Sequence, residues 1–255
     1  MRVHFSPIIG FICSTIIASS IAFPARAQSC ANSTHSPVTS ITLRSIARDL
    51  GIINDSMTTL TQNRRIGRSF QELVQRSMAY QQENGYAFTS PARSTATGGS
   101  RKTVRPDFTE RVTYVSNSGT LVDPYGSFVE VKATGAVLNP SYYYYQILGH
   151  IDAVSRRPAS GFFRGAARVL FITTSDTSVG TASTLKEGND RGVGIWKAIV
   201  CRTTPNSNSF QVGPAIPLNP GIYSQTPVPG SPGFVNGLSQ PGTTPSGYED
   251  ADGGY

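Results

Sequence analysis

The sequence contains few of the residues that build zinc sites, and few lysines. It has 3 cysteines and 3 histidines in 255 residues. Cys13 falls within an N-terminal apolar segment, so only Cys30 and Cys201 follow that segment. Two cysteines are too few for a cysteine-based zinc site. Lysine occurs only as Lys102, Lys132, Lys186 and Lys197.

The N-terminus has the pattern of a processing signal. Arg2 precedes a nearly uncharged apolar run from Pro7 to Phe23, and Ala25-Arg26-Ala27 resembles a cleavage site before Gln28. We therefore predict a signal peptide over residues 1–27 and a secreted or periplasmic protein. An uncleaved membrane anchor is the alternative, although the run is at the short limit for spanning a bilayer. No second apolar run of that length follows.

Cys30 and Cys201 form an even pair in a chain that we expect to be exported. Such a pair can form one disulfide that ties the N-terminal arm to the last predicted strand. Two unrelated buried thiols are the alternative.

The charge of the chain favours a polyanionic partner. The formal net charge is +7, and removal of Arg2 and Arg26 with the signal would lower it by two, to +5. Guanidinium groups match phosphate oxygens, and their binding to nucleic acid releases counterions. The arginines outside the signal include Arg64, Arg65, Arg68, Arg76, Arg101, Arg105, Arg156, Arg157, Arg164 and Arg168.

Composition divides the chain after the signal into three parts. Residues 28–63 form an arm with one predicted helix, Ser40 to Leu50, and residues 64–202 form a single core domain. Residues 203–255 are rich in proline, glycine and serine, and we predict that they are largely disordered.

Hydrophobic periodicity predicts an α/β core. Ile66, Phe70, Leu73, Val74 and Met78 form the apolar stripe of a first helix, which Asn84-Gly85 would close. We expect a three-layer-like sandwich, a central mixed sheet flanked by helices, in the order α-β-β-β-α-β. After the first helix the predicted elements are strand Tyr86–Thr89, loop Pro91–Arg101, strands Phe108–Val115 and Ser127–Thr134, helix Ser141–Val154, and strands Ala167–Thr173 and Gly194–Cys201.

Three residues form a candidate catalytic group. Glu130 and Lys132 share one face of their strand because side chains alternate. If the two strands form an antiparallel hairpin centred between Ser118 and Gly119, Asp107 lies opposite Glu130; a turn at Asp123-Pro124-Tyr125-Gly126 would change this register. Two adjacent carboxylates favour a hard divalent cation such as Mg²⁺. Lys132 would orient water or stabilise the transition state.

These residues resemble a known nuclease motif. Arg105-Pro106-Asp107 followed by Phe128-Val129-Glu130-Val131-Lys132, in this order of elements, resembles the PD-(D/E)xK restriction-endonuclease-like superfamily. The resemblance implies hydrolysis of nucleic-acid phosphodiesters with Mg²⁺ or Mn²⁺. Asp107, Glu130 and the Val131 backbone carbonyl would hold the metal. It also implies roles for Glu72 on the first helix and Gln146 on the second.

The residues around this motif leave several roles open. Glu72 lies nearly opposite the apolar stripe of its helix, so a solvated glutamate competes with a metal ligand. Gln146 shares one polar helix face with Tyr142, Tyr143 and His150, which either meets the site or faces solvent. Some relatives have tyrosine where His150 stands. The residues expected to contact nucleic acid are Arg68, Arg101, Arg105, Tyr143 and His150.

Three functional hypotheses follow. The first is an exported endonuclease that acts on DNA in preference to RNA, with RNA as the alternative substrate. It would be a toxin or effector with an immunity protein in the producing cell, and this setting is an argument by analogy. The second is an exported protein without catalysis that binds polyanions through its arginines. The third is an envelope protein tethered by its tail.

Overall fold

The structure is a computed structural model that describes residues 30, 36–80, 85–116, 119–134, 140–161, 164–204, 207–223 and 234–236. The predicted signal peptide lies outside the described residues. Among the described residues, no helix is both long and apolar enough to cross a bilayer.

A mixed eight-stranded sheet forms the centre of the molecule. Its strands run in the spatial order β1-β7-β6-β5-β4-β10, and β8 and β9 also pair with β7. Strands β5, β6 and β7 are parallel to one another, whereas the remaining pairs are antiparallel. The bounds are β1 Ser36–Pro37, β4 Phe108–Ser116, β5 Gly119–Lys132, β6 Arg168–Thr173, β7 Gly194–Arg202, β8 Phe210–Val212, β9 Ile216–Pro217 and β10 Phe234–Asn236.

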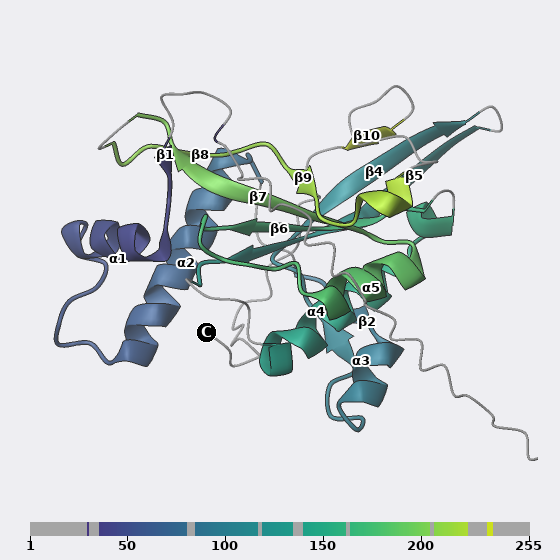
Figure 1. The fold of residues 1–255 in the computed structure, drawn as a ribbon, viewed down its shortest axis with the longest axis horizontal. Coiled ribbons are helices and arrows are strands. Elements are labelled where there is room, and N and C mark those ends of the chain that lie inside the picture. The colour runs from purple at the N-terminus through teal and green to yellow at the C-terminus, as the bar shows by residue number, and fades with distance from the viewer. Residues whose placement is uncertain are drawn as a thin grey trace, which may run out of the picture.

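The helices cover both faces of this sheet (Figure 1). Their bounds are α1 Ser40–Asp49, α2 Thr59–Ser77, α3 Pro91–Ala96, α4 Pro140–Ser155 and α5 Ala182–Arg191, with short 3₁₀ turns η1 Pro158–Gly161 and η2 Pro220–Tyr223. Strands β2 Phe88–Thr89 and β3 Thr103–Val104 form a separate pair beside α3. The fold is therefore α/β with a mixed sheet flanked by helices, as the coarse prediction stated.

Two hydrophobic cores lie on opposite faces of the sheet because strand side chains alternate. Val129 and Val131 of β5 pack with Phe70 and Val74 of α2. Phe128 of the same strand packs with Ile151 of α4 on the other face. The face that carries Phe128 also carries Glu130 and Lys132, so α4 covers the candidate site and α2 does not.

The predicted loop from Pro91 to Arg101 contains a helix. Ser90 is the N-cap of α3, and its hydroxyl accepts the Arg93 backbone N–H. Pro91 occupies the first turn, where a missing N–H costs nothing. The prediction of a loop was wrong because it gave this capping pattern less weight than the polar composition.

Strand β5 continues through the turn predicted at Asp123-Pro124-Tyr125-Gly126. Asp123 pairs with Val112 of β4, and a register shift lies between Glu110 and Val112. The Asp123 carboxylate also accepts a hydrogen bond from Arg157 at 2.7 Å. Pairing with β4 and this ion pair override the local turn signal.

Two other predictions need correction. Residues 207–223 were assigned to a disordered tail, but β8 and β9 extend the sheet, and Asn219 accepts the Ile195 N–H at 2.8 Å. Residues 224–233 and 237–255 lie outside the described part. Helix α5 was not predicted, and α2 ends at Ser77 instead of at Asn84-Gly85; Ala79 just beyond it has a left-handed φ of 54°.

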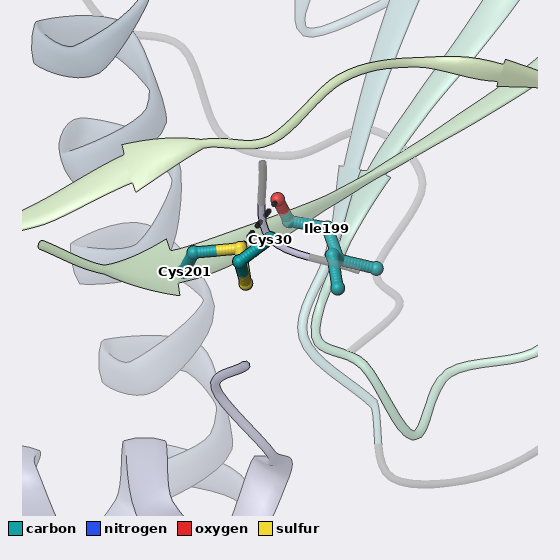
Figure 2. Close-up of a disulfide and its surroundings, with 3 residues drawn as sticks. All are labelled: Cys30, Ile199 and Cys201. Atoms are coloured by element: carbon teal, nitrogen blue, oxygen red, sulfur yellow. Dashed lines mark hydrogen bonds between the residues drawn. A yellow bond between two sulfur atoms is a disulfide. The ribbon is translucent and has the colours of Figure 1, made fainter. Parts of the chain in front are cut away.

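A disulfide joins Cys30 to Cys201 on β7, which is the first of the two alternatives that the sequence left open (Figure 2). Strand β1 pairs with the same end of β7. Leu43 of α1 is buried in the same core as Phe70. The arm before residue 64 therefore packs as part of the same body as the core.

Candidate nuclease site

Glu130 lies at the centre of a buried polar cluster between β5 and α4. Its side chain is 2% exposed. The Oε1 atom lies 2.6 Å from the Lys132 Nζ and accepts a hydrogen bond from the Gln146 Nε2 at 2.8 Å. A carboxylate this buried requires compensation, and the ammonium and the amide supply it. The structure thus brings together three residues that the sequence singled out.

His150 contacts the other oxygen of the same carboxylate. Its Nδ1 lies 3.5 Å from the Glu130 Oε2, and its ring meets Phe128 edge-on with centroids 6.0 Å apart. Only 1% of His150 is exposed. The expectation that His150 contacts a phosphate is therefore corrected: one turn after Gln146 on α4, it faces Glu130 from beneath the surface.

Asp107 lies where β4 begins, beside β5. Near the turn Ser116 pairs with Gly119, two residues off the predicted register, so the predicted centre of the hairpin was wrong. The register shift between Glu110 and Val112 compensates for this, so Phe108 pairs with Val129 as predicted, and extending the pairing by one residue places Asp107 opposite Glu130. The Asp107 Oδ2 accepts the backbone N–H of Val131 at 2.7 Å. This hydrogen bond fixes the Asp107 carboxylate at the edge of β5, one residue from Glu130.

Pro106 explains why the ladder between the two strands stops here. Extending the register by two residues places Pro106 opposite Val131. In a strand, the N–H and carbonyl of one residue point to the same edge. The Val131 carbonyl therefore points toward β4, where proline has no N–H to donate. The expected metal-binding carbonyl and the Asp107 carboxylate thus lie on the same edge of β5.

Tyr143 borders the cluster at the start of α4. Its ring centroid lies 5.9 Å from the Lys132 Nζ, and the side chain is half-buried. Arg105 is half-buried and lies two residues before Asp107. Arg101 is half-buried at the end of the α3–β3 connection, where its N–H donates to the Thr97 hydroxyl. Tyr142 lies where no side chain is described.

Glu72 and Arg68 lie apart from this cluster. Both belong to α2, which packs on the opposite face of the sheet. Glu72 forms an ion pair with Arg68 at 3.6 Å, with exposed fractions of 50% and 80% for the two side chains. The structure does not bring Glu72 near Glu130. The position of Glu72 agrees with the alternative of a solvated glutamate.

Lys197 is a cation on the sheet face of Glu130 that sequence reasoning missed. Phe171 pairs with Glu130 on one side and with Lys197 on the other, so all three lie in one row across the sheet. The Lys197 Nζ donates to the Thr177 carbonyl at 2.5 Å. Burial lowers the pKa of this amine below 10.5. No local sequence pattern could connect Lys197 to Glu130, because only sheet pairing relates them.

The oxygen atoms at this edge fit the chemistry of a hard cation. Mg²⁺ binds through one or two carboxylates and completes its shell with water and substrate oxygens. The Asp107 carboxylate, the Glu130 carboxylate and the Val131 carbonyl are such donors. Among the described residues, no group of three or more His, Cys, Asp or Glu side chains is arranged to hold a metal.

Comparison of the chain with protein-family models, with curated proteins and with solved structures found no match.

Proposed function

We propose that this chain is an exported metal-dependent nuclease of the PD-(D/E)xK type that hydrolyses phosphodiester bonds of DNA. The observation that supports this most is the contact of Glu130 with Lys132 and Gln146, one residue from the hydrogen bond between Asp107 and Val131. Four residues from three parts of the chain thereby converge at the end of one strand pair. Such convergence of charged groups is typical of catalytic sites.

Asp107, Glu130 and the Val131 carbonyl would hold Mg²⁺ or Mn²⁺. When bound, this ion would lower the pKa of a coordinated water and neutralise charge that develops on the phosphate. The same three groups would leave the remaining ligand positions to water and phosphate oxygens.

The remaining groups have positioning and electrostatic roles. The Lys132 ammonium, 9% exposed, would stabilise negative charge on the phosphate or orient the attacking water. Gln146 holds the Glu130 carboxylate, and Val131 holds that of Asp107. Arg101 and Arg105 lie on the segment that leads into Asp107 and would contact the phosphate backbone without reading bases.

The test uses the purified chain without residues 1–27. It is incubated with closed circular plasmid, linear duplex DNA, single-stranded DNA and RNA, each with Mg²⁺, with Mn²⁺ and with EDTA. We expect metal-dependent cleavage, DNA preferred over RNA, and linearisation of the circular plasmid, which only an endonuclease achieves because the plasmid has no end. Asp107→Asn and Glu130→Gln should abolish cleavage, although each substitution keeps the shape of the side chain.

Lys186→Met is the matched control for Lys132→Met. Lys186 lies on α5, and its side chain is 73% exposed in an ion pair with Asp190. Its substitution removes one lysine charge at a distance from the cluster and should leave cleavage unchanged. Activity that survives in Glu130→Gln or Lys132→Met contradicts the site.

A second candidate function is polyanion binding without catalysis. The observation that favours it is the state of Glu130, whose charge is already neutralised by Lys132 and whose side chain is almost fully buried. In this case DNA would bind with a strong dependence on salt, and no metal would produce cleavage. The cleavage assay therefore decides between the two candidates.

The biological setting that we propose is a toxin or effector acting outside the producing cytoplasm, with an immunity protein that protects the producer. The support is the N-terminal processing pattern of residues 1–27, together with the nuclease proposal. Expression with the signal should yield a secreted or periplasmic chain whose mass matches cleavage before Gln28. A chain that keeps residues 1–27 would contradict signal cleavage, and a cytoplasmic chain would contradict export.

A further inference from the structure

A groove lies on the helical layer opposite the candidate site. It is formed by α1, α2 and the segment before β8, and its volume is about 510 Å³. Its apolar lining comes mainly from Leu43 and Ile46 of α1, from Ile66 and Leu73 of α2, and from Phe210. Ser69, Glu72, Arg76 and Asn208 supply polar groups at its walls. A groove of this size, with an apolar lining and few polar groups, suits a ligand or a peptide segment.

Exposed apolar side chains surround the same two helices. Ile41 is 78% exposed, Leu50 54% and Leu60 49%, and Leu50 also lines the groove. Leu50 therefore leaves part of the apolar lining of the groove open to solvent.

The charge of this surface is positive. Between residues 40 and 78 there are six arginines and three acids, and those acids are Asp49, Asp55 and Glu72. Arg65, Arg68 and Arg76 are exposed on α2, and Arg76 lines the groove. Residues at spacings of three, seven and eleven fall on one side of a helix, so these three guanidinium groups form a row with Glu72. Glu72 is paired with Arg68, which leaves a net positive rim. An occupant of this groove should be acidic.

The chain itself contains a segment with this chemistry. No lysine or arginine occurs after Arg202, and the acids beyond that point are Glu249, Asp250 and Asp252. They directly follow Tyr248, an aromatic residue of a size that the apolar groove can hold. We propose that the segment Tyr248–Asp252 docks into the α1–α2 groove of its own chain, with Tyr248 in the apolar groove and the carboxylates on the arginine row.

The length of the chain permits this docking. Strand β10 ends at Asn236, and residues 237–247 separate it from Tyr248. When extended, such a connection spans up to roughly 40 Å. Five strand spacings of about 4.8 Å separate β10 from β8, whose Phe210 lines the groove, so the connection is long enough to reach the groove along the sheet.

The first experiment measures docking with a peptide probe. A fluorescent peptide of residues 246–255 is titrated with the parent chain and with a full-length variant that carries Glu249→Gln, Asp250→Asn and Asp252→Asn. We expect binding to the neutralised variant to be about tenfold tighter, because the tail of the parent chain competes for the groove at a high effective concentration. Peptides with the same three neutral substitutions, or with Tyr248→Ala, should bind several-fold more weakly.

The second experiment changes the groove. Arg65→Glu with Arg76→Glu, introduced into the neutralised variant, should weaken peptide binding about tenfold or more, and raised salt should weaken it as well. Lys186→Glu is the control. It replaces a positive by a negative charge, as each arginine substitution does, but on the other helical layer, and it should leave peptide binding unchanged.

Three results would overturn docking within the chain. The first is equal binding of the acidic and the neutral peptide. The second is that charge reversal of Arg65 and Arg76 abolishes binding of an oligonucleotide but not of the peptide, which would assign the groove to nucleic acid. The third is that the parent chain forms concentration-dependent dimers in sedimentation, which would assign the groove to the tail of another copy.

Discussion

At the candidate site, the opposite charges of Glu130 and Lys132 stabilise each other in a buried position. Glu130 and Lys132 lie 2.6 Å apart, and their side chains are 2% and 9% exposed. Either charge alone would lose its hydration without replacement. The pair is therefore a structural unit as well as the proposed catalytic one, and stability and activity must be measured separately for each variant.

Lys132→Met should affect both properties. It leaves the Glu130 carboxylate buried without its closest cation, and we expect a loss of about 3–5 kcal/mol in the free energy of unfolding. Cleavage should fall by a factor of about 100 to 1000, the range for loss of one preorganised catalytic donor. Urea unfolding and single-turnover cleavage provide the two measurements.

The double variant Glu130→Gln with Lys132→Met separates the two effects. Removal of both charges should restore most of the stability and none of the activity. Recovery of cleavage in the double variant would show that catalysis requires neither Glu130 nor Lys132, which would contradict the proposed site.

The Asp176 side chain links the arm to the sheet through the hydrogen bonds that its carboxylate accepts. Both of its oxygens accept the Ser40 N–H at 3.1 Å, and Oδ2 accepts the Ser40 hydroxyl at 2.6 Å. Desolvation opposes ionisation, but the hydrogen bonds from Ser40 and Thr174 outweigh it and lower the pKa below the ordinary value of 3.8. The carboxylate also lies at the N-terminus of α1, where negative charge is favoured.

Asp176→Asn should therefore reduce stability in a pH-dependent way. Because the pKa is lower in the folded than in the unfolded chain, the carboxylate stabilises the fold above about pH 4, and this stabilisation is lost as the pH falls through the folded pKa. Because Asp176 is exposed and solvent screens its charge, we expect a difference of about 0.5 kcal/mol or less at pH 7. Thermal unfolding from pH 2.5 to pH 7 measures it, and a constant difference over this range would contradict the role of the charge.

At the scale of elements, α4 depends on close contact with α3 and β3. A Cβ atom at Gly149 would lie 2.3 Å from the Val104 Cγ1 and 2.8 Å from the Arg93 Cδ. Gly149 adjoins His150 and lies one turn from Gln146, so the contact that requires glycine also sets the depth at which α4 presents these two residues to Glu130.

Gly149→Ala should push α4 away from β3. We expect a loss of about 1–3 kcal/mol from overpacking and reduced cleavage, because Gln146 moves with the helix. Gly161→Ala is the matched control, since nothing lies within 4 Å of a Cβ atom there, and its effect should stay within about 0.5 kcal/mol. Unfolding and cleavage are measured for both variants, and equal effects would contradict the packing argument.

At the scale of the whole molecule, the disulfide closes nearly the entire described chain into one loop. Cys30 and Cys201 are 171 residues apart in sequence, and Cys201 is fully buried on β7. The cross-link restricts the unfolded chain and anchors the segment before β1. It therefore stabilises the fold across the boundary that composition placed at residue 64.

Replacement of both cysteines by alanine should lower the free energy of unfolding by about 4–5 kcal/mol, the size expected for closure of so long a loop. Chemical unfolding of the parent chain with and without reductant measures the same quantity. Reductant should bring the parent to the stability of the double variant and leave the variant unchanged; a variant that is itself sensitive to reductant would contradict this interpretation.

The sequence by itself determined the elements with strong periodicity and the residues that share a strand. The helix predicted from Ser141 to Val154 and the strand from Ala167 to Thr173 agree with α4 and β6. Alternation placed Glu130 and Lys132 on one face, since that relation requires only a strand. Composition hid α3, β8 and β9. The polar residues of α3 form a helix with the help of the Ser90 cap, and β8 and β9 are short segments of a stretch rich in proline, glycine and serine that become strands by pairing with β7.

Only the tertiary structure decided which helix covers the site. The sequence favoured Gln146 over Glu72 but left open whether either reaches the site; α2 packs on the face of Val131 and α4 on the face of Glu130. Burial of His150 and the place of Lys197 in the row through Phe171 follow from the same arrangement. Helix periodicity gives the side of a helix that is apolar. The choice of sheet face depends on contacts between residues that are distant in sequence, which no local pattern contains.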